Sequence, residues 1–263
     1  IIHLKDLLAH PEKILALIKE ETEEVAAKYG DDRRTDIVAD EVEQINVEDM
    51  IKDEDMVVMI SRLGYIKRVS VEKYKKQGRG GTGSNGTNLL EDDYVNQLFI
   101  GSTKEHLLFI TNIGKAYWVK IHEIPEAEKT SRGAHIKGLL QVGPDEEITA
   151  IVSLMNFSDD LYLFMTTSNG VVKKVRSSEF ARAKTRGIIG IKLNDGDKLI
   201  SAIATKGDSD IMLISRRGKG LRFKDSSVRS MGRASCGIKG MKLAEGDEIA
   251  AAVKVENDTS MIL

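Results

Sequence analysis

The chain has 263 residues, 41% of them hydrophobic, which is enough for a packed core and somewhat more than one average domain. Its single cysteine, Cys236, excludes an internal disulfide framework and a multi-cysteine zinc site, and it favours a reducing, cytoplasmic setting. Residues 1–55 hold 7 Lys+Arg against 17 Asp+Glu, whereas residues 56–263 hold 32 against 24, so the net charge of -2 hides an acidic head and a basic body. The basic part predicts a polyanionic partner, although a merely solubilising surface would have the same charge.

Residues 1–37 are predicted to be the end of a helical or coiled-coil region. Apolar residues recur at helical spacing from Ile1 to Leu8, and a second helix is expected to begin at Pro11 and to end at Gly30. Because the helical pattern is already under way at residue 1, we expect the chain to be part of a longer polypeptide. Residues 38–55, rich in Asp and Glu, are predicted to form an acidic linker.

Residues 56–263 contain four similar units and the start of a fifth at residues 260–263. In each unit an apolar run reaches a turn glycine, a basic strand leaves it, an arginine- and glycine-containing stretch follows, and acidic residues introduce a second apolar strand. Repeats of about 50 residues with such short apolar runs predict an all-β, propeller-like fold of four-stranded blades. The apolar runs are expected at residues 56–60, 107–111, 161–166 and 211–215, and the turn glycines are Gly64, Gly114, Gly170 and Gly218.

The basic strands and the arginine-glycine stretches carry the candidate nucleic-acid contacts. If the units are equivalent blades, their cations project to one side and form a stripe that binds phosphates. Aromatic residues make up only 5% of the chain, which favours duplex DNA over a platform that stacks single-stranded bases. The candidate contacts are Lys67, Arg68, Lys115, Lys120, Arg132, Lys173, Lys174, Arg176, Arg186, Lys219, Arg222, Lys224 and Arg233.

A compact glycine-rich box occurs only in the first unit, at residues 77–83. Its glycines match the spacing of a dinucleotide fingerprint, but the following Ser84-Asn85-Gly86 cannot open the helix that such a site needs. A loop with few side chains can instead approach a phosphate closely, and an arginine in it adds a forked donor. The box residues, all candidate DNA contacts, are Gln77, Gly78, Arg79, Gly80, Gly81, Thr82 and Gly83.

No set of residues in the sequence has the spacing of a catalytic or metal site. The five histidines lack metal-ligand spacing, and Cys236 has no identifiable base beside it. By itself, this chain is expected to catalyse nothing and to need no cofactor. A kelch-like scaffold that binds proteins remains an alternative interpretation of the repeats, whereas the single tryptophan, Trp118, argues against WD40 blades.

The chain resembles the C-terminal part of DNA gyrase A subunits. Residues 30–37, reading GDDRRTDI, look like the end of that protein's long helices, and residues 170–174 and 222–229 resemble its blade sequences. The glycine box is similar to the family's diagnostic Gln-Arg-Arg-Gly-Gly-Lys-Gly, but Gly78 replaces an arginine and Thr82 replaces the lysine. Retention of the other five positions favours gyrase over the A-type subunit of topoisomerase IV, in which the box is eroded or missing.

The resemblance implies a β-pinwheel, normally of six four-stranded blades that exchange strands, with duplex DNA bent around its basic rim in a right-handed sense. In the family, this wrap lets the ATP-dependent type II topoisomerase, an isomerase, introduce negative supercoils. The implied partners are DNA, a second gyrase A chain and the gyrase B chain, which carries ATP and Mg. The cleaving tyrosine lies elsewhere in the gyrase A chain, so this chain alone is expected to be inactive. A topoisomerase IV domain would instead bind DNA without chiral wrapping.

Overall fold

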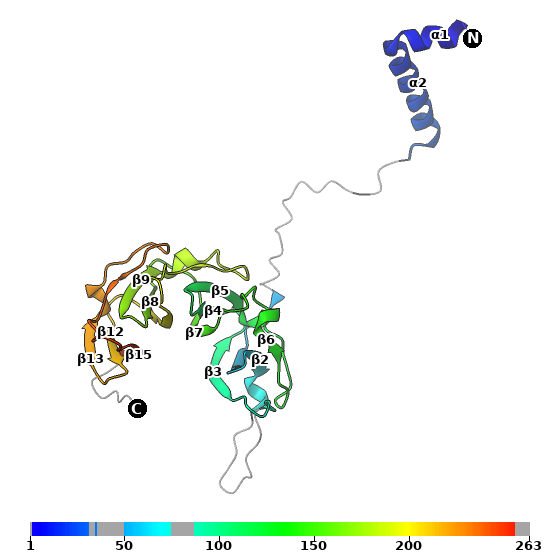
Figure 1. The fold of residues 1–263 in the computed structure, drawn as a ribbon. Helices are drawn as coiled ribbons and strands as arrows, with labels where there is room; N and C mark the ends of the chain where they lie inside the picture. Colours follow the sequence, from blue (N-terminus) through cyan, green and yellow to red (C-terminus); the bar gives the residue numbers. More distant parts are fainter. Residues whose placement is uncertain (1, 32–34, 36–49, 75–86, 256–263) are drawn as a thin grey trace. The chain divides into compact units, whose positions relative to one another are not determined.

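The structure is a computed structural model that describes residues 2–31, 35, 50–74 and 87–255 (Figure 1). It contains two compact units, residues 1–46 and residues 47–263. The predicted acidic linker, residues 38–55, lies mostly outside the described residues. Within the described ranges, no helix combines the length and the apolar character that are needed to cross a membrane.

The first unit consists of α1 (Ile2–Ala9) and α2 (Pro11–Tyr29), and the predicted break between them at Pro11 is confirmed. Proline suits the first turn of α2 because an N–H at this position would have no partner within the helix. At the other end, the N–H of Gly30 donates to the Ala26 carbonyl at 2.8 Å, and the helix ends there as predicted.

The second unit is built from β-strands and short 3-10 helices. Its hairpins are β1 (Asp55–Ser61) with β2 (Tyr65–Ser70), β4 (His106–Thr111) with β5 (Lys115–Lys120), β8 (Tyr162–Thr167) with β9 (Val171–Arg176), and β12 (Asp210–Ser215) with β13 (Gly220–Lys224). The second apolar strands are β3 (Val95–Ser102), β7 (Ile148–Leu154), β11 (Leu199–Thr205) and β15 (Ile249–Val255). Three two-residue strands are β6 (Ala134–His135), β10 (Ile188–Ile189) and β14 (Ile238–Lys239). The 3-10 helices are η2 (Val71–Lys73), η3 (Ile121–Glu123), η4 (Ile136–Gly138), η5 (Ser177–Phe180) and η6 (Asp225–Ser227).

These strands form four antiparallel sheets, the predicted blades, which we number 1 to 4 in chain order (Figure 1). Blade 1 has the order β3-β1-β2-β6, blade 2 β7-β4-β5-β10, blade 3 β11-β8-β9-β14, and blade 4, as described, β15-β12-β13. The outermost strand of blades 1 to 3 comes from the following repeat, since β6 comes after β5 in the chain but pairs with β2. The strand exchange that the resemblance implies is therefore present.

Each blade has an inner edge and a rim edge. Strands β3, β7, β11 and β15 form the inner edges, and β11 contacts both β7 and β15. The exchanged strands β6, β10 and β14 form the rim edges. Three hydrophobic clusters lie between neighbouring blades, and they include Phe109 for blades 1 and 2, Met165 for blades 2 and 3, and Ile211 for blades 3 and 4. The apolar strands are therefore buried by stacking of one repeat on the next.

In blades 1, 3 and 4, an aspartate that precedes the inner strand holds the hairpin turn. The turn glycines adopt the left-handed conformation, with φ between 78° and 84°. Asp93 accepts the N–H of Leu63 at 3.0 Å, and Asp197 and Asp247 accept the equivalent N–H groups in blades 3 and 4. Burial alone would raise the pKa of Asp93, but hydrogen bonds from Ser61, Leu63 and Tyr94 outweigh it and lower the pKa below its usual value. The predicted role of the acidic residues as turn residues is confirmed.

Candidate functional site

Three segments, which we call the connectors, carry the chain from each 3-10 helix at the end of a hairpin to the exchanged strand of the preceding blade. They are residues 124–133, 181–187 and 228–237. Each ends in a left-handed glycine, Gly133, Gly187 or Gly237, with φ of 90°, 72° and 89°. A Cβ on Gly133 would lie 2.4 Å from the Ile66 carbonyl oxygen, and one on Gly187 would lie 2.3 Å from the Tyr117 ring. The glycines of the arginine-glycine stretches are thus needed for close passage over the neighbouring blade.

In blades 1 and 3, the third residue after the turn glycine holds a connector in place. Lys67 is 1% exposed, and its Nζ donates to the carbonyls of Lys129 and Ser131, both at 2.6 Å. Lys173 is fully buried, and its Nζ donates to the carbonyls of Gly190 and Ser235, both at 2.9 Å, and to that of Arg233. Both lysines therefore bind the carbonyls four and two residues before the last glycine of a connector.

Blade 2 has a different residue at this position. Tyr117 packs its ring against Gly187 and donates its hydroxyl to Glu146 at 2.8 Å. Burial and the hydrogen bond to Glu146 raise the pKa of Tyr117 far above its usual value. The connector that follows blade 2 is therefore held by ring packing and by backbone hydrogen bonds, such as the one from Gln141 N–H to the Thr185 carbonyl at 3.0 Å.

In blades 1 to 3, the fourth residue after the turn glycine also donates to the following repeat. The donors differ in type: Arg68 Nε reaches the Ile124 carbonyl at 2.6 Å, Trp118 Nε1 the Ala181 carbonyl at 3.2 Å, and Lys174 Nζ the Asp225 carbonyl at 2.7 Å. In each case the acceptor is a backbone carbonyl at or beside the 3-10 helix. We call the third and fourth positions the anchor positions.

The anchor positions correct one prediction. Lys67, Lys173 and Lys174 were expected to project from the strands into an exposed stripe, and this expectation is wrong because all three are buried and bonded to carbonyls. Burial lowers the pKa of Lys67, and it lowers that of Lys173 to about 8. These lysines hold the blades together, and their ammonium groups do not face solvent.

Other predicted strand cations have partners of their own. Lys115 Nζ lies 2.8 Å from Glu146 Oε1, and Arg222 Nη2 lies 2.5 Å from Asp210 Oδ2. Arg176 Nη1 is 4.0 Å from Asp159, and Lys219 Nζ donates to the Lys242 carbonyl. Arg68, an anchor residue, also lies 4.0 Å from Glu126, and Lys120 is half-buried. Of the predicted strand cations, Arg176, Lys219, Arg222 and Lys224 are exposed.

The second and third connectors and the segments that follow them carry exposed charge that strand periodicity overlooked. Arg132 and Arg186, both predicted, are exposed, and the Arg132 guanidinium lies 5.4 Å from the Tyr65 ring centroid. The sequence holds no Asp or Glu at residues 180–194 or 226–244, and this absence is the signal that could have identified the further cations. The exposed cations that were missed in these two segments are Arg182, Lys184, Lys192, Arg229, Lys239 and Lys242.

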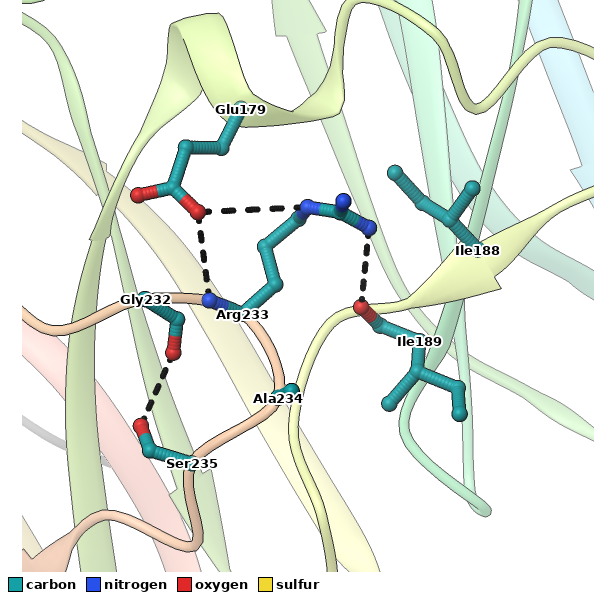
Figure 2. Close-up of a pocket in the computed structure, with 7 residues that line it drawn as sticks. All are labelled: Glu179, Ile188, Ile189, Gly232, Arg233, Ala234 and Ser235. Carbon is teal, nitrogen blue, oxygen red and sulfur yellow. Dashed lines mark hydrogen bonds and ion pairs between the residues drawn. The ribbon is translucent and has the colours of Figure 1, made fainter.

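Arg233 joins two of these segments (Figure 2). Its backbone N–H donates to Glu179 Oε2 at 3.1 Å, its Nε lies 3.9 Å from the same oxygen, and its Nη1 donates to the Ile189 carbonyl at 3.4 Å. These residues border an open hollow of about 620 Å³ with mainly apolar walls, which include Ile188 and Ile189. Arg233, a half-buried residue of the third connector, thus contacts η5 through Glu179 and the exchanged strand β10 through Ile189.

The glycine box at residues 77–83 lies outside the described residues, so its assignment stays a prediction. Among the residues that the structure describes, no group of three His, Cys, Asp or Glu side chains is arranged to hold a metal ion. The candidate site is therefore a surface formed by the connectors, the exchanged strands and the exposed strand cations, which we call the rim surface.

Comparison with known proteins identifies the family to which these repeats belong. A family model described as "DNA gyrase C-terminal domain, beta-propeller" matches residues 55–102, 105–154, 161–206 and 209–256, and each interval runs from the first strand of a blade to its inner strand. The DNA gyrase A protein of Treponema pallidum is 52% identical over 232 residues, and that of Clostridium acetobutylicum is 41% identical over 233. These alignments cover 88% and 89% of this chain but 28% of each relative, so the chain spans little more than a quarter of their length.

Two solved structures show the same fold. The C-terminal domain of a DNA topoisomerase IV has a TM-score of 0.68 and 28% identity, and the match covers 79% of this chain and 63% of that one. A DNA gyrase A C-terminal domain has a TM-score of 0.62 and 33% identity, and the match covers 77% and 66%. With its repeats matched by the family model and its blades exchanging strands, the chain belongs to the family of DNA gyrase C-terminal domains.

Proposed function

We propose that this chain binds duplex DNA along the rim surface and wraps it. The observation that carries the proposal is the position of charge. The second connector contains two arginines and a lysine, the third contains two arginines, and neither contains an acidic residue. Both run beside the exchanged strands at the rim edge. Cations of this kind neutralise phosphates and release counterions, which gives affinity without base readout. The buried lysines of the anchor positions take no part in DNA binding.

The three connectors differ in charge, which suggests different roles. The first contains Glu126 and Glu128 as well as Lys129 and Arg132, and both glutamates lie close to Lys73, at 3.5 and 3.3 Å. The first connector is thus neutral overall, whereas the other two are positive. We propose that the glycine box of the first repeat supplies the phosphate contacts that this connector does not, and that it completes the wrap.

In the longer protein, the wrap would serve an ATP-dependent type II topoisomerase that introduces negative supercoils. We propose the partners in that enzyme as a second gyrase A chain and the gyrase B chain, with ATP and Mg held by gyrase B and no cofactor held by this chain. The proposed setting is the bacterial cytoplasm, at the chromosome. The contribution of this chain would be the direction of supercoiling, with the chemistry done elsewhere in the enzyme.

The proposal can be tested by the change in linking number. Nicked circular DNA is ligated in the presence of the chain and then analysed by gel electrophoresis, with DNA affinity measured at several salt concentrations. We expect a shift in linking number, which disappears in the triple variant Arg182→Ala, Lys184→Ala, Arg186→Ala. For each phosphate that the variant no longer neutralises, the slope of log affinity against log salt should become shallower by about 0.9. Replacement of residues 77–83 by alanines should abolish the shift without unfolding the blades.

A matched control removes the same charge away from the connectors. Lys104, Lys198 and Lys206 are exposed and lie in turns between strands of the blades. Their triple alanine variant should retain the linking-number shift and nearly all of the affinity. Equal losses of affinity in both triple variants would mean that overall charge, and not the rim surface, binds DNA.

Two other outcomes would identify the alternative functions. Tight, salt-dependent binding without a linking-number shift would indicate the function expected of a topoisomerase IV domain, whose fold is similar to this one. A shallow salt slope, with no preference for DNA over an acidic protein, would indicate a scaffold that binds proteins. Either result would contradict DNA wrapping by this chain.

A further inference from the structure

The inner edges of blades 2, 3 and 4 are closely joined. The Leu199 N–H at the start of β11 donates to the Asn112 carbonyl in the turn of blade 2, at 2.9 Å. The Ile249 N–H at the start of β15 donates in the same way to the Ser168 carbonyl of blade 3, at 2.8 Å. Each of these bonds joins the hairpin turn of one blade to the inner strand of the next.

Blades 1 and 2 lack this connection. The equivalent pair is the Ile148 N–H and the Arg62 carbonyl, and the described residues contain no hydrogen bond between them. A hollow of about 590 Å³ lies at this place, with walls that include both residues. A second hollow of about 500 Å³ separates β3 from β7 further along the strands. The two hollows share Asn96, Gln97 and Ile151.

The side chains between the inner strands account for the difference. Where blade 3 faces blade 2, the small residues Ala202 and Ala204 of β11 allow close approach, and Ala252 of β15 does so where blade 4 faces blade 3. At the first interface, the packed residues are Ile151 of β7 and Phe99 of β3. A branched and an aromatic side chain hold two strands apart where alanines do not.

The rim edge of the same interface is firmly joined. Lys67 and Arg68 donate to the first connector, and the Asn88 N–H donates to the Thr130 carbonyl at 2.9 Å. Strand β6 pairs with β2, and Lys73 lies 3.3 Å from Glu128. At the inner edge, β3 and β7 are linked at one end only, where Glu105 accepts the Ser102 N–H at 3.3 Å and the Ser153 hydroxyl. Blades 1 and 2 are therefore joined along the whole rim edge but only at one end of the inner edge, which is the geometry of a hinge.

We propose that blade 1 rotates as a rigid sheet about its rim edge, whereas blades 2 to 4 move as one body. The hollows between β3 and β7 provide the space for this motion, and the anchor positions Lys67 and Arg68 form its axis. In its consequence for DNA the inference rests on the proposed function: a duplex that lies across the rim of blades 1 and 2 would select one hinge angle.

Equivalent exposed positions in three hairpin turns allow a direct test. Leu63, Ile113 and Asn169 each precede a turn glycine, in blades 1, 2 and 3, and each side chain is exposed. Pairs of cysteines are introduced into the full chain with Cys236→Ser, spin-labelled, and measured by double electron–electron resonance. Without DNA, the 63–113 distance distribution should be distinctly broader than the 113–169 distribution. Duplex DNA should narrow and shift the first and leave the second unchanged.

One substitution should transfer the motion to the next interface. Ala202→Ile introduces into β11, which faces β7, the same residue type as Ile151 of β7, which faces β3. The β7–β11 interface should therefore loosen, and the 113–169 distance distribution should broaden in this variant. Equal widths for the two pairs in the parent chain would overturn the hinge, and this comparison stands whether or not the variant folds. A broad 63–113 distribution that DNA leaves unchanged would retain the hinge but contradict its selection by DNA.

Discussion

Lysines in equivalent strands of different blades have different roles in this protein. Lys173 is buried and donates to three backbone carbonyls, whereas Lys224 is exposed. Burial of an ammonium group is costly unless hydrogen bonds replace its water. The carbonyls around Lys173 provide them. Removal of the amine would take this donor from the Gly190 and Arg233 carbonyls, whereas the Ser235 carbonyl would still accept the Lys192 N–H at 3.1 Å.

At this scale we expect Lys173→Met to reduce the free energy of unfolding by about 1–3 kcal/mol, because the buried carbonyls lose their donor. Chemical denaturation of the variant and the parent chain measures this loss. Arg186→Ala, which truncates an exposed side chain, is the control and should change stability by less than about 0.5 kcal/mol. A smaller effect for Lys173→Met than for the control would contradict the anchor role.

The pKa of Lys173 adds a pH dependence. In the folded chain the pKa is about 8, against the usual 10.5, so between these values the unfolded state binds more protons. Stability that depends on this amine therefore rises from pH 8 to pH 10.5, by at most about 1.4 kcal/mol per pH unit, and the cost of burying the charge is fully present below pH 8. The deficit of Lys173→Met should accordingly grow over this range. A deficit that is constant with pH would show that the pKa is not lowered.

At the scale of elements, the hairpins and inner strands could be predicted from the sequence. Short apolar runs, glycine turns and acidic turn residues are local signals, and they recur in each repeat. The exchanged strands could not be located in this way because each is two residues long and pairs with a strand that lies more than 60 residues before it in the chain. Only the resemblance implied that an exchange exists.

The same limit explains the errors among the candidate contacts. Lys67 and Lys173 lie in strands that carry several cations, and nothing local distinguishes them from exposed lysines. Their burial depends on connectors that come from the following repeat and cover them. The connector cations Arg182 and Lys184 were missed for the opposite reason, since they belong to no strand with a recognisable period.

The connector glycines provide a prediction at this scale. Gly187→Ala should destabilise the protein strongly, by more than about 2 kcal/mol, because the left-handed conformation disfavours a side chain and the new Cβ would overlap the Tyr117 ring. Gly196 has nearly the same φ, 74° against 72°, but no heavy atom lies within 4 Å of a Cβ there. Gly196→Ala should therefore cost only about 1–2 kcal/mol. Thermal and chemical unfolding of both variants would measure the two effects, since Gly196→Ala adds only backbone strain and Gly187→Ala adds the overlap with Tyr117 as well. Equal destabilisation of the two variants would contradict a contribution from this overlap.

For the whole molecule, strand exchange makes each blade depend on the repeat that follows it. Strand β14 comes from the fourth repeat and completes blade 3, with Ile238 opposite Val172 and Lys239 opposite Val171. Disruption of β14, which belongs to the fourth repeat, should therefore destabilise blade 3.

Hydrogen exchange measured by mass spectrometry can test this dependence. In the variant Ile238→Pro, the missing N–H and the restricted backbone should disrupt the pairing of β14 with β9. Amide protection should fall in β9 and remain in β12, which pairs with β13 and β15. Loss of protection in β12 with retention in β9 would show that stability follows sequence repeats and not the exchanged sheets.

The hydrogen bonds from the anchor positions to the following repeat are made to backbone carbonyls. Their acceptors are the carbonyls of Ile124, Lys129, Ser131, Ala181, Asp225, Gly190, Arg233 and Ser235. In addition, Arg68 lies 4.0 Å from the Glu126 carboxylate, and Tyr117 donates to Glu146 of its own repeat. Any residue presents the same carbonyl, so most connector positions can change their side chain while every anchor bond is kept. The charge of a connector can therefore differ from blade to blade, neutral in the first and positive in the next two, while the hydrogen bonds that join neighbouring blades are kept.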